Sequence, residues 1–240
     1  MPGAYADALD AGLAALGMAL EPRARTVIDG HMRLLLAWTG SINLTAIRDP
    51  AAAASGHVVD SLTAIPILRD RGADRLLDLG SGGGLPGIPL AAALPGIRAL
   101  LVESTGKKAA FLRTVATATG IDDRVEVAGA RAEATAAEPR HRGRWPVVTA
   151  RAVAPLAELV ELAFPLLAPG GCLIAWKRGE SIDEERAAER AIAALGGGEL
   201  VRHPVTVPSL PGHVLLVATR TGVVPDGYPR ANTVRKRRPW

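Results

Sequence analysis

The residues with the most recognisable chemistry lie between positions 75 and 103. The hydrophobic run from Leu76 to Leu79 is followed by a glycine-rich turn, and the next hydrophobic run closes on an acid, Glu103. Glycines let the backbone turn tightly and approach a ligand with no side chain in the way. Pro86 suits the first turn of a helix, whose free N–H groups would face that ligand. This order predicts a strand, a turn and a helix start that bind a nucleoside cofactor.

Two kinds of nucleoside cofactor agree with this spacing. Gly82, Gly84 and Gly87 follow the dinucleotide fingerprint, and Glu103 lies about where the ribose-binding acid is expected, roughly 20 residues on. Counted from the first glycine of the turn, however, the third fingerprint position is Leu85 instead of glycine. An NAD(P)-dependent oxidoreductase is therefore one hypothesis, although the sequence offers no identifiable acid or base for hydride transfer.

The same turn also matches a second motif. Asp78, Gly80, Gly82 and Gly84 occupy alternate positions, an order that resembles the acidic and glycine-rich motif of class I S-adenosylmethionine methyltransferases. The resemblance implies that the acid lies under the methionine end of the cofactor and that the glycines pass close to it. Glu103 would then bind the ribose hydroxyls. We therefore expect S-adenosylmethionine as the cofactor.

The residues after the expected fourth strand restrict the methyl acceptor. Methyl transfer from a sulfonium is an in-line displacement, for which the protein mainly supplies proximity and orientation. Methylases of exocyclic amino groups usually carry Asn or Asp before Pro-Pro and an aromatic residue there, whereas residues 149–155 of this chain lack that run. Cytosine C5 methylation needs a cysteine nucleophile, and Cys172 lies in an apolar run typical of a buried residue. A ring nitrogen with a free lone pair, such as guanine N7, needs no general base.

Five segments carry a more specific signal than the glycine turn, above all an Asn-Leu-Thr and a His-x-x-Asp-Ser element. The segments are 41–50, 57–62, 77–90, 150–154 and 176–179. Together, in this order and over nearly the whole chain, they resemble the RsmG (GidB) family of 16S ribosomal RNA guanine-N7 methyltransferases. The resemblance implies 16S rRNA or the small ribosomal subunit particle as the partner. A non-catalytic rRNA-binding or assembly protein with the same fold is a further hypothesis.

The two resemblances also imply which residues form the site. The cofactor-binding set combines the strand acid, the glycine turn, the ribose acid and residues that follow the third and fourth strands. It comprises Asp78, Gly80, Gly82, Leu85, Glu103, Ala132, Glu133 and Arg151. No catalytic residue is assigned, but Arg151 and Lys177 directly follow strands and are candidates for positioning the substrate. His57 and Asp60 lie three apart on an expected helix, and we expect them to pack the N-terminal helices onto the cofactor domain instead of binding a metal.

The formal charge of +4 is concentrated at the C-terminus. Residues 222–240 contain five basic residues and one acid, which leaves the rest of the chain neutral. The tail has no hydrophobic pattern, so we expect it to be mobile or ordered only on a partner. Basic residues in the tail and after two strands are candidates for RNA phosphate contacts. These candidates are Lys107, Lys108, Arg113, Lys177, Arg178, Arg235, Lys236, Arg237 and Arg238.

Other bulk properties concern the cellular setting. Cys172 is the single cysteine, so an internal disulfide is excluded and a reducing cytoplasm is expected. The N-terminus has no basic region before a continuous apolar run, and we expect neither secretion nor membrane insertion. We also expect a monomer without a bound metal.

Periodicity divides the chain into a helical N-terminal region 1–70, an S-adenosylmethionine-binding domain 71–220 and a basic tail 221–240. Helices are expected over 5–20 and 22–38, with a third beginning at Asp49 and Pro50. Apolar strands then alternate with helices, which predicts an α/β, Rossmann-like parallel sheet covered on both faces, the class I methyltransferase fold. Expected strands are 76–79, 99–103, 124–128, 146–150, 172–176, 200–207 and 213–219; expected helices are 90–94, 107–119, 155–167 and 183–195. The short turn 208–212 favours an antiparallel hairpin at the end of the sheet.

Overall fold

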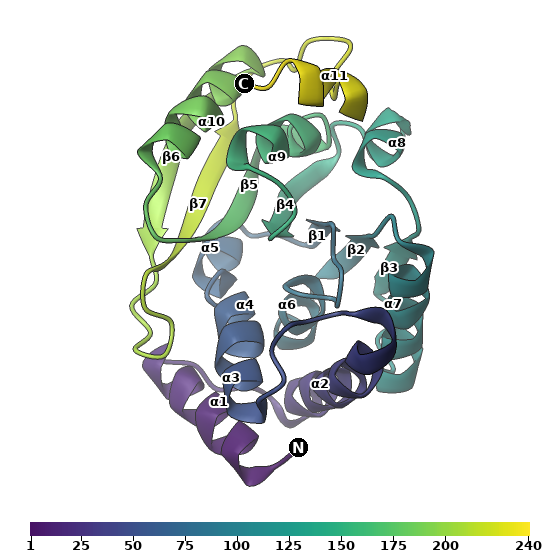
Figure 1. The fold of residues 1–240 in the computed structure, drawn as a ribbon, viewed down its shortest axis with the longest axis vertical. Helices are drawn as coiled ribbons and strands as arrows, with labels where there is room; N and C mark the ends of the chain where they lie inside the picture. Colours follow the sequence, from purple (N-terminus) through teal and green to yellow (C-terminus); the bar gives the residue numbers. More distant parts are fainter.

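A computed structural model describes all residues, 1–240, and its centre is a seven-stranded sheet in the order β3-β2-β1-β4-β5-β7-β6 (Figure 1). The strands are β1 (Arg75–Leu79), β2 (Arg98–Val102), β3 (Val125–Ala128), β4 (Trp145–Arg151), β5 (Leu167–Arg178), β6 (Gly197–Pro204) and β7 (His213–Arg220). Strands β1 to β5 run parallel, and β7 is antiparallel to both β5 and β6. The predicted α/β sheet and its terminal hairpin are confirmed.

Strand residues alternate between two hydrophobic clusters because successive side chains of a strand point to opposite faces. In β1, Leu76 belongs to a cluster of 38 buried residues and Leu77 to a separate cluster of 26. The same alternation separates Ile174 from Leu173 in β5. Because both faces are buried, these strands read as nearly continuous apolar runs in the sequence.

Helices cover both faces of the sheet. One face carries the N-terminal helices together with the two that follow β1 and β2, and the other carries the remaining helices (Figure 1). The first group is α1 (Gly3–Ala15), α2 (Pro22–Ile42), α3 (Pro50–Ala53), the π-helix η1 (Ala54–Val59), α4 (Asp60–Leu62), α5 (Ile65–Asp70), α6 (Gly87–Ala93) and α7 (Gly106–Thr119). The second group is α8 (Ala132–Ala137), α9 (Leu156–Ala163), α10 (Ile182–Ala194) and α11 (Asn232–Arg237).

A local sequence signal explains where α3 begins. Asp49 caps α3, as predicted, because its carboxylate accepts a hydrogen bond from the Ala52 amide at 2.7 Å.

The segment Pro50–Asp70 is long and apolar enough to cross a membrane by composition alone, but 67% of its most apolar window is buried inside the protein. It is also divided into four short helical pieces. This segment is part of the core that supports the sheet.

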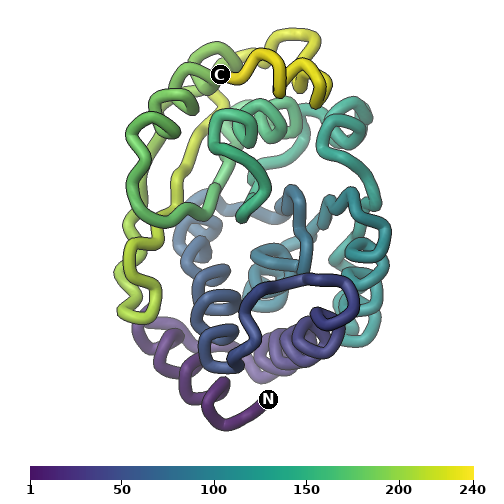
Figure 2. The backbone as a smooth tube through the Cα atoms, in the orientation of Figure 1, coloured from purple at the N-terminus to yellow at the C-terminus, as the bar shows by residue number.

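The C-terminal tail differs from the expectation of a mobile segment. It forms α11 and lies across α8 and α9, at the opposite end of the molecule from the N-terminus (Figure 2). Arg230 forms an ion pair with Glu161 of α9 at 2.6 Å, and Arg235 is only 7% exposed. The expectation of a tail that is mobile or ordered only on a partner is therefore wrong for this structure, because Arg230 pairs with the buried Glu161 and Arg235 with the half-buried Glu158, both on α9.

Candidate active site

The glycine turn lies at the carboxyl end of β1 and has backbone angles that favour glycine. Gly80 has φ +68°, and a Cβ atom there would lie 2.8 Å from a side-chain carbon of Val153. Any other residue at this position would combine a left-handed backbone with a close contact. The turn is therefore held as an open cradle beneath the loop that follows β4.

Glu103, at the end of β2, anchors this cradle. One carboxylate oxygen accepts a hydrogen bond from the Gly82 amide at 2.9 Å, and the other accepts one from the Thr105 amide at 2.7 Å. The residue is only 7% exposed. A carboxylate has about four acceptor positions, so both oxygens can still accept hydrogen bonds from a ligand. Glu103 is thus preorganised at the edge of the turn.

Asp78 supports the turn from below. It is fully buried, and its carboxylate accepts hydrogen bonds from the Thr149 hydroxyl at 2.8 Å and from the Gly87 amide at 3.2 Å. Burial raises the pKa of Asp78 to about 6, although these hydrogen bonds oppose the shift. Asp78 lines neither of the cavities described below. The structure therefore places it as a support for the turn and for the start of α6, and not as a direct ligand contact.

A histidine from α2, which the sequence analysis did not select, holds the other side of the turn. His31 is fully buried, and its Nε2 lies 2.7 Å from the Gly83 carbonyl oxygen. Burial lowers the pKa of His31 to about 4, so the ring is neutral at neutral pH and Nε2 carries the hydrogen that it donates. A lone histidine on an apolar helix face carries no sequence signal of this role.

Two cavities meet above the turn. The larger, about 570 Å³, is lined by Leu85, Glu103, Lys108 and Arg151 among others, and the smaller measures about 250 Å³. Gly80, Ser104 and Val153 line both cavities. The two therefore form neighbouring compartments along the carboxyl ends of the strands, where open α/β sheets bind ligands.

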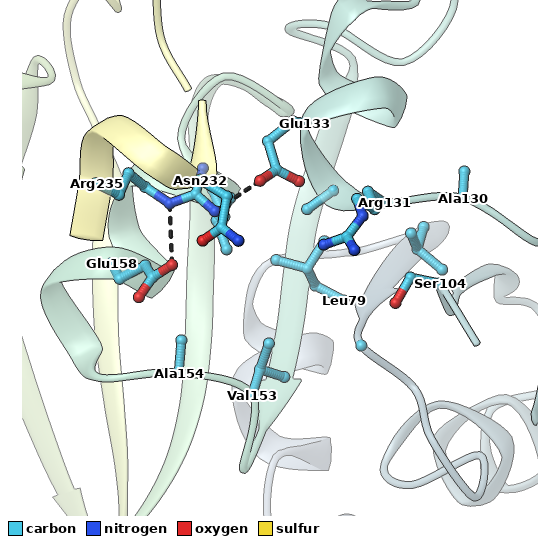
Figure 3. Close-up of a pocket in the computed structure, with 14 residues that line it drawn as sticks. Leu79, Ser104, Ala130, Arg131, Glu133, Val153, Ala154, Glu158, Asn232 and Arg235 are labelled. Carbon is cyan, nitrogen blue, oxygen red and sulfur yellow. Dashed lines mark hydrogen bonds and ion pairs between the residues drawn. The ribbon is translucent and has the colours of Figure 1, made fainter. Parts of the chain in front are cut away.

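The smaller compartment lies between the end of β1 and the helices α8, α9 and α11 (Figure 3). Ala132 and Glu133, both predicted site residues, line it together with Arg235 of the tail. Burial opposes ionisation of Glu133, but its hydrogen bond with Arg235 lowers its pKa below the usual range. One wall of the compartment thus carries the negative charge of Glu133, and Arg235 of the tail neutralises this charge.

Asp60 joins the N-terminal helices to the larger compartment. Its carboxylate pairs with Arg151 of β4 and with His213 of β7, each at 2.8 Å, and its carbonyl accepts the Trp176 indole hydrogen bond at 2.8 Å. The predicted packing role of Asp60 is confirmed. His57 also lines this compartment, and burial lowers its pKa to about 4 while its Nε2 lies 2.7 Å from the Thr45 hydroxyl.

The predicted basic residues separate into distinct environments. Lys108 is half-buried and lines the larger compartment. Lys177 pairs with Glu184 at 2.5 Å and lines neither compartment, so its predicted positioning role is not supported by its location. Arg235 is buried between two glutamates, so it offers little surface for the predicted RNA contact. The remaining candidates are exposed: Lys107, Arg113, Arg178, Lys236, Arg237 and Arg238.

Solved structures with the same arrangement define the class. An O-methyltransferase from Bacillus cereus, solved in complex with SAH, matches with a TM-score of 0.57 at 19% identity, covering 80% of this chain and 90% of that chain. A putative O-methyltransferase from Klebsiella pneumoniae matches with the same TM-score and identity, over 88% and 94% of the two chains. The fold is that of class I methyltransferases, whose cofactor is S-adenosylmethionine.

Sequence comparison then identifies the family. The family model described as rRNA small subunit methyltransferase G (GidB) matches residues 26–207. Ribosomal RNA small subunit methyltransferase G of Roseiflexus sp. (strain RS-1) is 41% identical over 94% of this chain and 95% of its own length. The protein of the same description from Stenotrophomonas maltophilia (strain K279a) is 43% identical, over 92% and 97%. The chain belongs to this GidB family, and the expected family resemblance is confirmed. These relatives support the methyltransferase hypothesis and not the oxidoreductase one.

Proposed function

We propose that this protein transfers the methyl group of S-adenosylmethionine to N7 of a guanine in 16S ribosomal RNA of the small subunit. The observation that carries the proposal is the pair of compartments that meet over Gly80, with the Glu103 carboxylate anchored at their edge. One compartment suits a nucleoside, and the other leaves room for the methyl-bearing end and an acceptor base. When bound, the cofactor supplies an electrophilic methyl group.

The chain's own residues fit that cofactor. The two Glu103 oxygens can accept the ribose hydroxyls while they keep their backbone hydrogen bonds. Ala132 and Glu133 lie in the compartment that would take the adenine. Leu85 and Arg151 line the compartment that would take the methionine, and Arg151 offers a cation for its carboxylate.

The protonation states in the larger compartment suit an acceptor that needs no general base. The low pKa of His57 leaves its ring neutral, and Thr45 already engages its Nε2. Asp60 is held by Arg151 and His213. Guanine N7 has a free lone pair and loses no proton on methylation at that atom, so orienting the base is the main requirement.

The RNA would approach at the mouth of the larger compartment. Lys108 stands at this opening, and the exposed Lys107 follows β2 on the same helix start. Phosphate contacts of this kind fix the position of the strand, and one base must leave its stack to reach the methyl group. The proposed enzyme is a cytoplasmic monomer that acts on rRNA or on a small-subunit particle.

The direct test is incubation of the purified protein with methyl-labelled S-adenosylmethionine and unmodified small-subunit RNA or particles, followed by nucleoside analysis. We expect label in 7-methylguanosine at a single site. The Glu103→Ala variant serves as a control with impaired cofactor binding. Label at another atom, or no label although the cofactor binds, would contradict the proposal.

A further inference from the structure

The C-terminal strap, defined as residues 228–240, is fastened to the methyltransferase domain by a buried charge. Glu161 of α9 is 0% exposed, and both of its carboxylate oxygens accept hydrogen bonds from the Arg230 guanidinium, at 2.9 and 2.6 Å. The Arg230 backbone amide donates a further hydrogen bond at 2.8 Å, and the Trp240 indole donates another at 2.7 Å. Burial opposes ionisation of Glu161, but these donors lower its pKa below the usual range. Its side-chain partners all come from the strap, so the buried charge requires a docked tail.

The strap also closes on itself. The Arg230 guanidinium lies 5.7 Å from the Tyr228 ring centre and 4.9 Å from that of Trp240, and the two rings stack at 6.1 Å. The Arg230 guanidinium donates to the Arg238 carbonyl at 3.0 Å. The cation–π contacts and this internal hydrogen bond give the strap a defined shape. Because the strap is also anchored at Glu161, α11 is held at one position against α8 and α9.

That position brings two strap residues into the smaller compartment. Arg235 bridges its walls, pairing with Glu133 of α8 at 2.6 Å and with Glu158 of α9 at 2.9 Å (Figure 3). Asn232 lines the same compartment and is half-buried. Its carboxamide makes no hydrogen bond to another protein group. The compartment is therefore incomplete without the strap.

We propose that the C-terminal strap is a wall of the adenine compartment, in which Asn232 is a specificity residue for the purine and Arg235 is a positioning residue that holds Glu133. This inference rests on the proposed placement of the cofactor, with its adenine in the smaller compartment. An asparagine carboxamide can donate to adenine N7 while it accepts from the 6-amino group. Arg235 acts on the ligand indirectly. It holds the Glu133 carboxylate in place, and by pairing with Glu158 as well it fixes the spacing between α8 and α9.

The purine test compares two ligands that differ in one group. S-adenosylhomocysteine carries a 6-amino group, and S-inosylhomocysteine carries an oxygen in its place, which reverses the hydrogen-bonding direction. We expect Asn232→Ala to weaken binding of the adenosine ligand about 10-fold by calorimetry, the loss of one to two hydrogen bonds. The preference over the inosine ligand would fall by a similar factor. An unchanged preference would overturn the role of Asn232.

The positioning test separates cofactor from RNA effects. We expect Arg235→Ala to raise the KM for S-adenosylmethionine about 10-fold, with kcat and the KM for RNA nearly unchanged, and Arg235→Lys to recover part of the loss. A rise in the KM for RNA alone would instead assign Arg235 to RNA binding. Arg140→Ala is the matched control, because Arg140 also pairs with a glutamate at 2.7 Å but is exposed and lines neither compartment.

Melting curves establish that each variant is folded, and Asn232→Ala, at a half-buried position, keeps the test independent of strap docking. The Glu103→Ala variant distinguishes failure of the strap proposal from failure of the proposed cofactor placement. If Glu103→Ala weakens cofactor binding while the strap variants do not, the strap proposal alone is overturned. If none of these variants weakens binding, the cofactor placement itself is wrong.

Discussion

Replacing Glu103 by alanine tests how the cofactor is held, and its effect can be worked out from the structure. The carboxylate is fixed by the Gly82 and Thr105 amides at 2.9 and 2.7 Å, so it binds the ribose hydroxyls with little further ordering. A hydrogen bond to a charged acceptor contributes about 1.5–3 kcal/mol. Loss of two such bonds, allowing for incomplete additivity, costs about 3 kcal/mol, or roughly 100-fold in Kd.

The variant also leaves two backbone N–H groups without their acceptor. One of them belongs to Thr105, which is exposed and can bond to water, so we expect the free energy of unfolding to fall by only about 1–2 kcal/mol. Calorimetry with S-adenosylhomocysteine measures the first effect, and urea unfolding measures the second. Glu103→Gln keeps one acceptor oxygen and is expected to lose about 10-fold in affinity.

A cofactor analogue that lacks one ribose hydroxyl tests whether Glu103 contacts the ribose directly or only supports the glycine turn. With the wild type, a 2′-deoxy analogue should bind more weakly than S-adenosylhomocysteine, and with Glu103→Ala the difference should vanish. A folded Glu103→Ala protein that binds within threefold of the wild type would refute the reasoning.

Three further outcomes follow from the same geometry. Asp60→Asn removes the partner of Arg151, whose side chain is 15% exposed. Urea unfolding should therefore show a loss of about 2 kcal/mol, below the cost of breaking a fully buried pair, and a loss under about 0.5 kcal/mol would contradict this. Gly80→Ala places a Cβ 2.8 Å from Val153 at φ +68°, so stability should fall by about 1–2 kcal/mol and calorimetry should detect weaker cofactor binding; an unchanged Kd counts against the cradle. The pKa of Asp78 is raised from 3.8 to about 6, so its neutral form stabilises the native state below pH 4 and that contribution is lost as the pH rises through 6. The free energy of unfolding of the wild type, relative to Asp78→Asn, should fall by about 3 kcal/mol across this window, whereas a pH-independent difference would contradict the assignment.

The sheet and the glycine turn could be predicted because their signals are local. The central residues of β1 and β5 are buried on both faces, so they form nearly continuous apolar runs. The turn that follows β1 needs glycine at Gly80, and the acid at the end of the next strand lies beside it through parallel pairing. Such features depend on neighbouring residues and on the register of adjacent strands.

The missed features depend on contacts between residues far apart in the chain. The strap was predicted as mobile because its own composition is polar and basic, while its partner Glu161 lies 69 residues away in α9. Lys177 reads as a free cation after a strand, but α10 folds back to bring Glu184 against it. His31 gave no signal because only the packing of α2 places it on the turn.

The most direct test of the proposed cofactor site is a crystal structure of this protein with S-adenosylhomocysteine. We expect the ribose hydroxyls on Glu103, the adenine in the smaller compartment between Ala132 and Asn232, and the homocysteine end in the larger compartment beside Arg151. An adenine in the larger compartment, or a ribose away from Glu103, would contradict it.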